Sequence, residues 1–146
     1  MSSIPFSFKT IAASVAVATA AGLSAVAFAA PASAATVTNH PIAVSNCNST
    51  GQICAERPTV TVNTNSGLKV EFTASRAHCS DMIAHIYIDG AEWGSAKVGP
   101  GQRDGGYFIP VTPGTHDVSI VAEGVTGGCN TGKLASWAGN LRVETN

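Results

Sequence analysis

Hydrophobic and polar residues alternate with a period of two along most of the chain after residue 58, the pattern of β-strands that bury one face. In the stretch LKVEFTA, for example, Leu68, Val70 and Phe72 share one face, and charged residues occupy the other. Strands are expected at 59–63, 68–74, 83–89, 92–98, 107–111, 115–123 and 134–145. About seven short strands separated by turn residues predict an all-β, immunoglobulin-like or fibronectin-III-like antiparallel sandwich.

The N-terminal third of the chain has a different pattern. Lys9 precedes a long run rich in Ala and Val, which ends at Ala32-Ser33-Ala34, a small-x-small pattern typical of signal-peptide cleavage. The run is long enough to span a membrane, but its Ala, Ser and Thr content favours a cleaved secretory signal over 1–34 rather than a retained anchor. Residues 35–58 are expected to form an irregular N-terminal arm, and residues 59–146 the sandwich domain. We therefore expect a secreted, extracellular or cell-surface protein without a membrane span after cleavage.

Charge and motifs exclude several classes of function. The formal net charge is −1 and no basic run occurs, which argues against a nucleic-acid partner. The stretch GGCNTGK, 127–133, matches most of a phosphate-binding loop. However, Leu134 stands where Ser or Thr would hold Mg²⁺, and a strand pattern follows instead of a helix. The nucleophile motif G-x-S-x-G is absent, so we expect a non-catalytic protein. We also expect a monomer that carries no cofactor.

The four cysteines all follow the expected cleavage site, and an even number in an exported chain predicts two disulfides. Three pairings are possible. The short loop between Cys47 and Cys54 favours their pairing, which leaves Cys79 to pair with Cys129. In a sandwich whose loops alternate between its two ends, the loops at 75–82, 99–106 and 124–133 would share one end. A Cys79–Cys129 bond would then join two of these loops.

Polar loops on a rigid sandwich are common binding sites, so the joined loops supply most of the candidate binding residues. They are Arg76, His78, Asp81, Gln102, Arg103, Asn130 and Lys133. Tyr87 and Trp93 are added because the Asp89-Gly90 turn brings their strands together, and exposed aromatic rings can stack on sugars or anchor protein partners. For the loops the alternative is ordinary solvation, and for Trp93 ordinary burial against a neighbouring strand, which is favoured.

Histidine, aspartate and tryptophan residues elsewhere in the chain have less specific signals. His78, Asp81 and His85 could offer metal ligands, but their spacing matches no strong signature and His85 is expected on a solvated strand face; no metal site is predicted. His116 shares the phase of Val118 and is expected to be a hydrogen-bonded residue at a corner of the sandwich rather than a base. Trp137 is expected in the core.

The segments IYIDGAEWGS, 86–95, and VTPGTHDVSIVAEG, 111–124, resemble bacterial immunoglobulin-like and PEGA-like modules. In those modules a strand ends in Asp-Gly, and a Pro-Gly-Thr turn later precedes an alternating strand. The resemblance implies an adhesion, binding or spacer domain at the bacterial surface and assigns no catalytic residue. The expected function is a secreted binding or surface-interaction module for a protein or glycan. The alternatives are an extracellular inhibitor of a secreted enzyme and a structural envelope protein.

Overall fold

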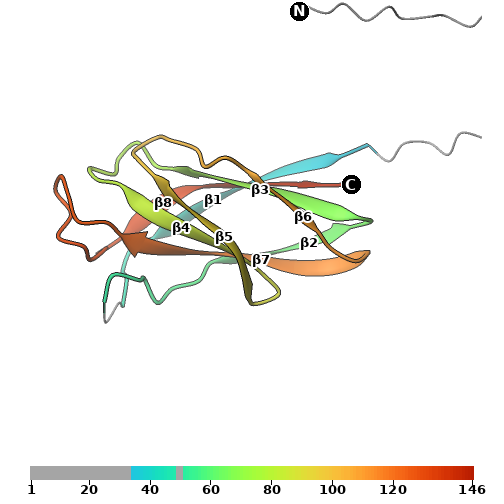
Figure 1. The fold of residues 1–146 in the computed structure, drawn as a ribbon, viewed down its shortest axis with the longest axis horizontal. Helices are drawn as coiled ribbons and strands as arrows, with labels where there is room; N and C mark the ends of the chain where they lie inside the picture. Colours follow the sequence, from blue (N-terminus) through green and yellow to red (C-terminus); the bar gives the residue numbers. More distant parts are fainter. Residues whose placement is uncertain (1–33, 49–50) are drawn as a thin grey trace, which may run out of the picture. The chain divides into compact units, whose positions relative to one another are not determined.

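The computed structural model describes residues 34–48 and 51–146, so the expected signal segment lies almost wholly outside the described residues. Eight strands form two antiparallel four-stranded sheets (Figure 1). Their bounds are β1 (Thr36–Val44), β2 (Thr59–Thr64), β3 (Gly67–Ala74), β4 (Met82–Ile88), β5 (Ala91–Val98), β6 (Tyr107–Pro110), β7 (Gly114–Gly124) and β8 (Trp137–Thr145). The prediction of an all-β sandwich is confirmed. Over these residues no helix is long and apolar enough to cross a membrane.

The strand order differs from the immunoglobulin arrangement that the sequence suggested. The first sheet has the order β1-β8-β3-β6 and the second the order β2-β7-β4-β5. The chain therefore changes sheet at every connection except the β4–β5 hairpin. Two Greek keys wound in this way give the eight-stranded jelly roll, whereas an immunoglobulin domain keeps its first two strands in the same sheet. The turn signals in the sequence locate the strands but do not assign them to sheets.

The prediction of an irregular arm over 35–58 is wrong for its first part, which is strand β1. This strand pairs with β8 over its full length, from Thr36 opposite Thr145 to Val44 opposite Trp137. Only its last residues are buried, among them Ile42, so the alternation is too weak to identify the strand. Hydrogen bonding to β8 fixes it instead. The later part of the arm, 52–58, follows the edge of β7, where the Cys54 amide donates to the Ala122 carbonyl at 2.8 Å.

The core lies between the sheets and is built from the inward residues of the alternating pattern, such as Leu68, Val70, Ile86 and Ile120, all fully buried. Trp137 is 2% exposed, as expected for a core residue. Its ring meets the Phe72 ring edge-on, with centroids 5.9 Å apart and planes at 73°. This edge-to-face contact is a favourable aromatic geometry and ties the start of β8 to β3.

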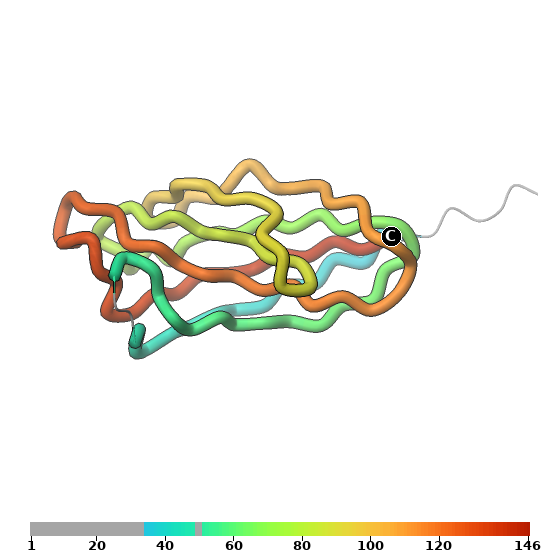
Figure 2. Tube along the Cα trace, turned by 60° about the horizontal axis from the view of Figure 1, so that its bottom comes forward, coloured from blue at the N-terminus to red at the C-terminus, as the bar shows by residue number. Residues whose placement is uncertain are grey.

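The two ends of the sandwich are unequal (Figure 2). One end carries only the tight turns at 65–66, 89–90 and 111–113, and the other carries the long loops at 45–58, 75–81, 99–106 and 125–136. Both predicted disulfides, Cys47–Cys54 and Cys79–Cys129, lie in these long loops, with Cα atoms 5.1 and 5.8 Å apart. We call this the stapled end. The expectation that 75–82, 99–106 and 124–133 share one end is met.

Candidate binding cleft at the stapled end

A cleft of about 470 Å³ opens at the stapled end, between the last residues of β1, the segment that leads into β8, and the loops joined by Cys79–Cys129. Drug-sized ligand pockets have volumes in this range. Its floor includes Leu134 and Trp137, which are 8% and 2% exposed. Much of the remaining apolar lining comes from smaller residues, among them Ala43, Val44, Ala77 and Ala135. Polar groups stand among them, notably His78, Asn130 and Lys133.

The walls of the cleft are held by more than the disulfide. The Ser80 hydroxyl donates to the Gly127 carbonyl at 2.7 Å. Gly127 and Asn130 exchange backbone hydrogen bonds of 3.0 and 2.9 Å, and the Asn130 side-chain oxygen accepts from the Gly132 amide at 2.9 Å. Gly128 adopts φ 56°, and a Cβ there would lie 2.8 Å from the Cys79 carbonyl oxygen. Glycine is required where the backbones approach so closely, so the loop around Cys129 has a defined shape.

His78 lies against the start of β8. Its Nε2 atom is 3.0 Å from the Ala138 carbonyl oxygen and 3.1 Å from the Ala138 amide nitrogen. One tautomer donates to the carbonyl and the other accepts from the amide, so the ring has a partner in either state. The His78 amide also donates to the Ser75 carbonyl at 3.2 Å. These bonds place a half-buried imidazole in the wall of the cleft.

The other predicted loop residues lie outside the cleft. Asp81 forms an ion pair with Lys97 at 3.0 Å beside a smaller neighbouring hollow. Arg76 packs against Gly101, and a Cβ atom added to Gly101 would lie 2.7 Å from the Arg76 Cγ atom. The Gln102 side-chain oxygen accepts from the Gly99 amide at 3.0 Å and shapes its own loop. Of the seven predicted loop residues, the structure therefore brings His78, Asn130 and Lys133 together in one cleft.

The two predicted aromatic residues have different environments. Tyr87 is half-buried beneath the Arg57 guanidinium, which lies 4.0 Å from the ring centroid, and burial raises the pKa of its hydroxyl. Trp93 is 46% exposed, so the favoured interpretation of ordinary burial is wrong. The β4–β5 register shifts at this point, with Tyr87 opposite Glu92 and Ile86 opposite Gly94. Trp93 is therefore the extra residue of a β-bulge, which redirects its side chain.

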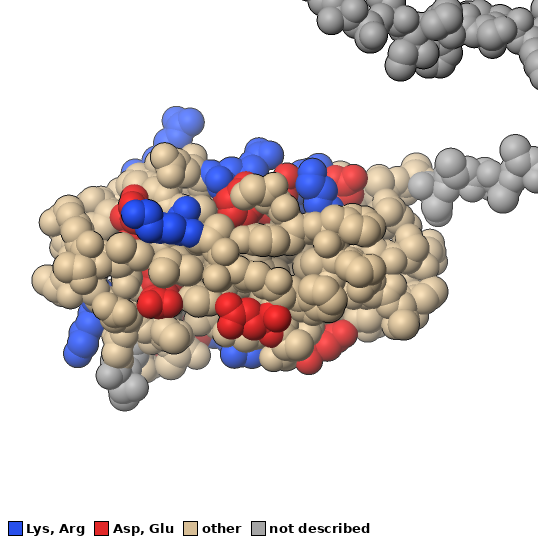
Figure 3. Space-filling view, in the orientation of Figure 1, with Lys and Arg blue, Asp and Glu red and all other residues tan. Residues whose placement is uncertain are grey.

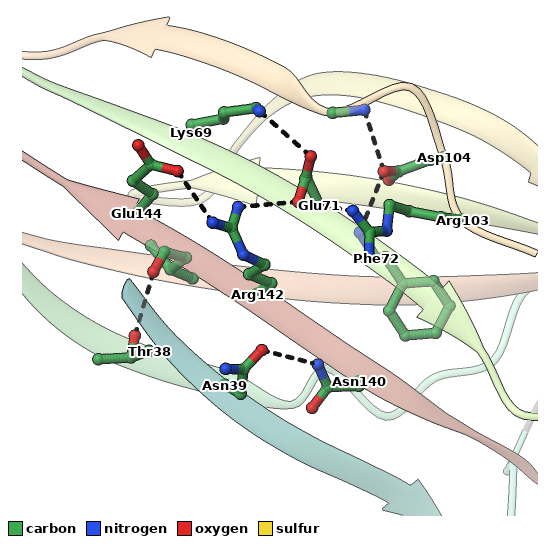
Figure 4. Close-up of polar contacts among 12 residues, drawn as sticks. Thr38, Asn39, Lys69, Glu71, Phe72, Arg103, Asp104, Asn140, Arg142 and Glu144 are labelled. Carbon is green, nitrogen blue, oxygen red and sulfur yellow. Dashed lines mark hydrogen bonds and ion pairs between the residues drawn. The ribbon is translucent and has the colours of Figure 1, made fainter. Parts of the chain in front are cut away.

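A polar network that no sequence pattern indicated lies on the outer face of the first sheet (Figure 4). At its centre, Glu71 is only 7% exposed. Its carboxylate lies 3.3 Å from Lys69, 2.9 Å from Arg142 and 3.5 Å from Arg103. Burial raises the pKa of Glu71, but Lys69 and Arg142 outweigh this effect and hold the pKa below its usual range. Arg103, a predicted ligand-binding residue, belongs to this network and not to the cleft.

Asp104, beside this network, is buried. Its Oδ1 atom accepts from the Phe72 amide at 3.1 Å and from the Gly106 amide at 3.2 Å. Its Oδ2 atom has no hydrogen-bond partner within the described part of the chain. Burial raises the pKa of Asp104 despite the two amide bonds, and the nearby charge of Glu71 acts in the same direction. Alternation alone gave no signal for this residue, because it lies in a loop.

Two histidines outside the cleft are each held by carboxylates. His85 is half-buried and lies 2.8 Å from Glu92 and 3.0 Å from Glu123. His116 is a hydrogen-bonded corner residue, as expected, with its ring 2.7 Å from Asp89 and 2.9 Å from the Thr112 carbonyl oxygen. The bond to Asp89 raises the pKa of His116, and the same bond lowers the pKa of Asp89.

Within 34–48 and 51–146, Cys47, Cys54 and Glu56 are the group close enough to share a metal ion. Both sulfurs are joined in a disulfide and cannot act as thiolate ligands. His78, Asp81 and His85 do not form such a group in the described structure. Neither set of residues therefore has a metal-binding geometry in the described part of the chain.

No family model matches the chain, and no curated protein matches it, so the resemblance to PEGA-like modules is not supported by a family match. Solved structures with a similar fold include the CBM36-1 domain of a multidomain xylanase from the hindgut metagenome of Trinervitermes trinervoides. That match has TM-score 0.49 and 10% identity, and covers 77% of this chain and 98% of that one.

A family 35 carbohydrate binding module from an environmental isolate matches with TM-score 0.44 and 15% identity, over 78% of this chain and 90% of that one. The VP2 subviral particle of infectious bursal disease virus matches with TM-score 0.36 and 14% identity, over 77% of this chain and 33% of that one. At such identities the likeness concerns the arrangement of strands and says nothing of a ligand.

Proposed function

We propose that the protein is an exported, non-catalytic binding module that holds a segment of a protein partner in the cleft at the stapled end. The observation that carries the proposal is the cleft itself, about 470 Å³ in volume, with two of its walls joined by Cys79–Cys129. Disulfides persist in oxidising, extracytoplasmic compartments, which supports export. Loops that are ordered before binding lose less entropy when a partner arrives.

The chemistry of the lining favours a peptide segment with an apolar side chain. Exposed small side chains such as Ala43 and Ala135 line the cleft, and Leu134 and Trp137 lie almost fully buried beneath them. The cleft therefore offers a hydrophobic surface but no exposed aromatic face on which a sugar could stack. The rim offers hydrogen-bonding groups on His78 and Asn130. Lys133 is exposed and forms no ion pair with any residue of 34–48 or 51–146, so it is free to meet a carboxylate of the partner.

The test fills the cleft and follows peptide binding. Ala135 lines the cleft and is exposed, so Ala135→Phe should occupy the space without disturbing the core. Ala55 is exposed and outside the lining, so Ala55→Phe adds the same ring as a matched control. Random peptides displayed on phage would be selected on the purified, oxidised chain. We expect the selected peptides to bind the control like the wild type and Ala135→Phe at least tenfold more weakly.

Fluorescence gives a second readout at the site. The chain has two tryptophans, so Trp93→Phe leaves Trp137 in the cleft floor as the sole reporter. A selected peptide should shift the emission of Trp137 with the same concentration dependence as its binding. If the library yields no binder, or if the binders neither distinguish Ala135→Phe from the wild type nor perturb Trp137, the proposed function is wrong.

A further inference from the structure

Two large aromatic side chains remain exposed on one edge of the sandwich, away from the stapled cleft. Trp93 of β5 is 46% exposed, and Phe108 of β6 is 68% exposed. Both strands are edge strands, one in each sheet. The residues next to the two aromatic residues in the sequence, Gly94 and Tyr107, pack against each other. A Cβ atom added to Gly94 would lie only 2.8 Å from the Tyr107 ring. Trp93 and Phe108 therefore lie on two edge strands that meet along the same side of the sandwich, which we call the aromatic edge.

Phe108 is held in place although it is exposed. Its ring lies over Gly67 of β3, where a Cβ would be 3.0 Å from Cζ. In the β3–β6 register Phe108 stands opposite Lys69, so both side chains project from the outer face of the first sheet. The network of Glu71 with Lys69, Arg103 and Arg142 continues along this face (Figure 4). An exposed aromatic ring thus adjoins a row of hydrogen-bonding groups.

The charges of this row largely compensate one another, because two carboxylates meet three cationic side chains. Glu71 meets three cationic side chains, and Arg142 also meets Glu144 at 3.1 Å. In the space-filling view, Lys and Arg side chains along the upper margin have Asp and Glu side chains beside them, and further Asp and Glu side chains lie across the lower part (Figure 3). A surface whose charges are already paired recruits an acidic polymer poorly. Its guanidinium and carboxylate groups can still exchange hydrogen bonds with hydroxyl groups.

The exposed aromatic area argues for a small repeating unit as the ligand. A large aromatic side chain offers about 200 Å², so the exposed fractions of Trp93 and Phe108 amount to roughly 230 Å². A stable protein partner needs about 800 Å² on each side. A sugar ring presents a flat C–H face that stacks on one aromatic ring and hydroxyl groups that reach polar neighbours, which matches the scale and chemistry of this edge.

From these observations we infer that the aromatic edge, with Trp93 and Phe108 as stacking rings and Lys69, Glu71 and Arg103 as hydrogen-bonding neighbours, is a second binding site, for a neutral polysaccharide chain. The inference is independent of the peptide proposed for the stapled cleft. It gives the module two surfaces that could be engaged together, one by a glycan and one by a protein.

The experiment is sedimentation of the purified, oxidised chain with microcrystalline cellulose and with chitin, both neutral. Cross-linked polygalacturonate serves as the acidic counterpart. We expect at least one neutral polymer to deplete the wild type from solution, and Trp93→Ala and Phe108→Ala each to weaken that binding roughly fivefold to tenfold. Val37, which is 43% exposed on β1, supplies the matched control: Val37→Ala should pellet like the wild type, and so should the cleft variant Ala135→Phe.

Thermal unfolding of each variant shows whether the fold is kept, which is expected because the replaced rings are exposed. The inference is overturned if neither neutral polymer retains the wild type, if polygalacturonate alone retains it, or if the two aromatic variants pellet as the wild type does. Loss of binding in Ala135→Phe together with full retention by Phe108→Ala would also overturn it, because the glycan would then occupy the cleft.

Discussion

The substitution Gly139→Ala tests how closely the first sheet packs beneath the cleft. Gly139 faces the core from β8, opposite Ala74 of β3. A Cβ there would lie 2.3 Å from Phe72 Cζ and 2.5 Å from the Thr73 carbonyl oxygen. The φ of Gly139 is outside the positive region, so alanine is compatible with the backbone and the effect is steric. Without the clash, alanine in a strand would stabilise the protein by about 0.5–1 kcal/mol relative to glycine.

The expected magnitude follows from which atoms could move. Overpacking a core destabilises by about 1–3 kcal/mol, and here one of the two obstacles is a backbone oxygen in a paired strand. The other is the Phe72 ring, which cannot turn aside without leaving its edge-on contact with Trp137. We therefore expect Gly139→Ala to lower the free energy of unfolding by about 2–3 kcal/mol. In a domain of this size that corresponds to a fall in Tm of roughly 10 °C.

Urea unfolding at equilibrium measures the loss. Gly105→Ala is the control, because a Cβ there meets nothing within 4 Å and its φ is not positive; its effect should stay within about 0.5 kcal/mol. Phe72→Leu should partly rescue Gly139→Ala in a double-mutant cycle, with a favourable coupling of about 0.5–3 kcal/mol. A Gly139→Ala variant as stable as the wild type, or one with no coupling to residue 72, would refute the packing argument.

Three further predictions concern the stapled end and two titrating sites. Replacing Cys79 and Cys129 by Ser removes a crosslink with a sequence separation of 50 and should lower the free energy of unfolding by about 4 kcal/mol on the chain-entropy estimate. Urea unfolding contradicts this if the loss is smaller than the loss from replacing Cys47 and Cys54, whose sequence separation is 7. Because the pKa of His116 is raised, its contribution to the stability of the fold is complete below its unfolded pKa of about 6.5 and is lost as pH rises through the folded pKa. Its partner Asp89, with a lowered pKa, contributes above about 3.8 and loses that contribution as pH falls through the folded pKa. Stability profiles of the wild type and His116→Gln should therefore differ most between about pH 4 and 6.5, and parallel profiles would count against the pair. For Asp104 the raised pKa means that ionisation opposes folding as pH rises, so Asp104→Asn should flatten the pH dependence of Tm; an unchanged slope contradicts the role of burial.

The parts of the fold that could be predicted are those encoded locally. Alternation located seven strands, and the Asp89-Gly90 turn identified the β4–β5 hairpin. The spacing of the cysteines gave both disulfides because loop closure favours the short pair. Strand β1 was missed because none of its first six residues is buried and its pairing partner is β8, about a hundred residues away. The jelly-roll order was missed for the same reason, since sheet membership is decided by distant pairing.

The candidate sites, too, could be predicted from the sequence only in part. His78, Asn130 and Lys133 could be grouped because loop alternation and one disulfide bring their loops together. The floor of the cleft could not be predicted, because Val44 reaches it from a strand that the sequence did not reveal. The exposure of Trp93 depends on a register shift between two strands, and no pattern of side chains along one strand signals such a shift.

The unequal ends of the sandwich support the proposal that the stapled end is shaped for binding and not only for stability. Every connection at the opposite end is a tight turn, so this fold tolerates short loops. Long loops lower stability through the entropy of ordering them, and all four cysteines lie where the loops are long. A domain selected for stability alone would reach it more directly by shortening those loops. Long loops fixed by disulfides, hydrogen bonds and a left-handed Gly128 instead keep a cleft of defined shape open, which is the arrangement that lowers the entropy lost on binding.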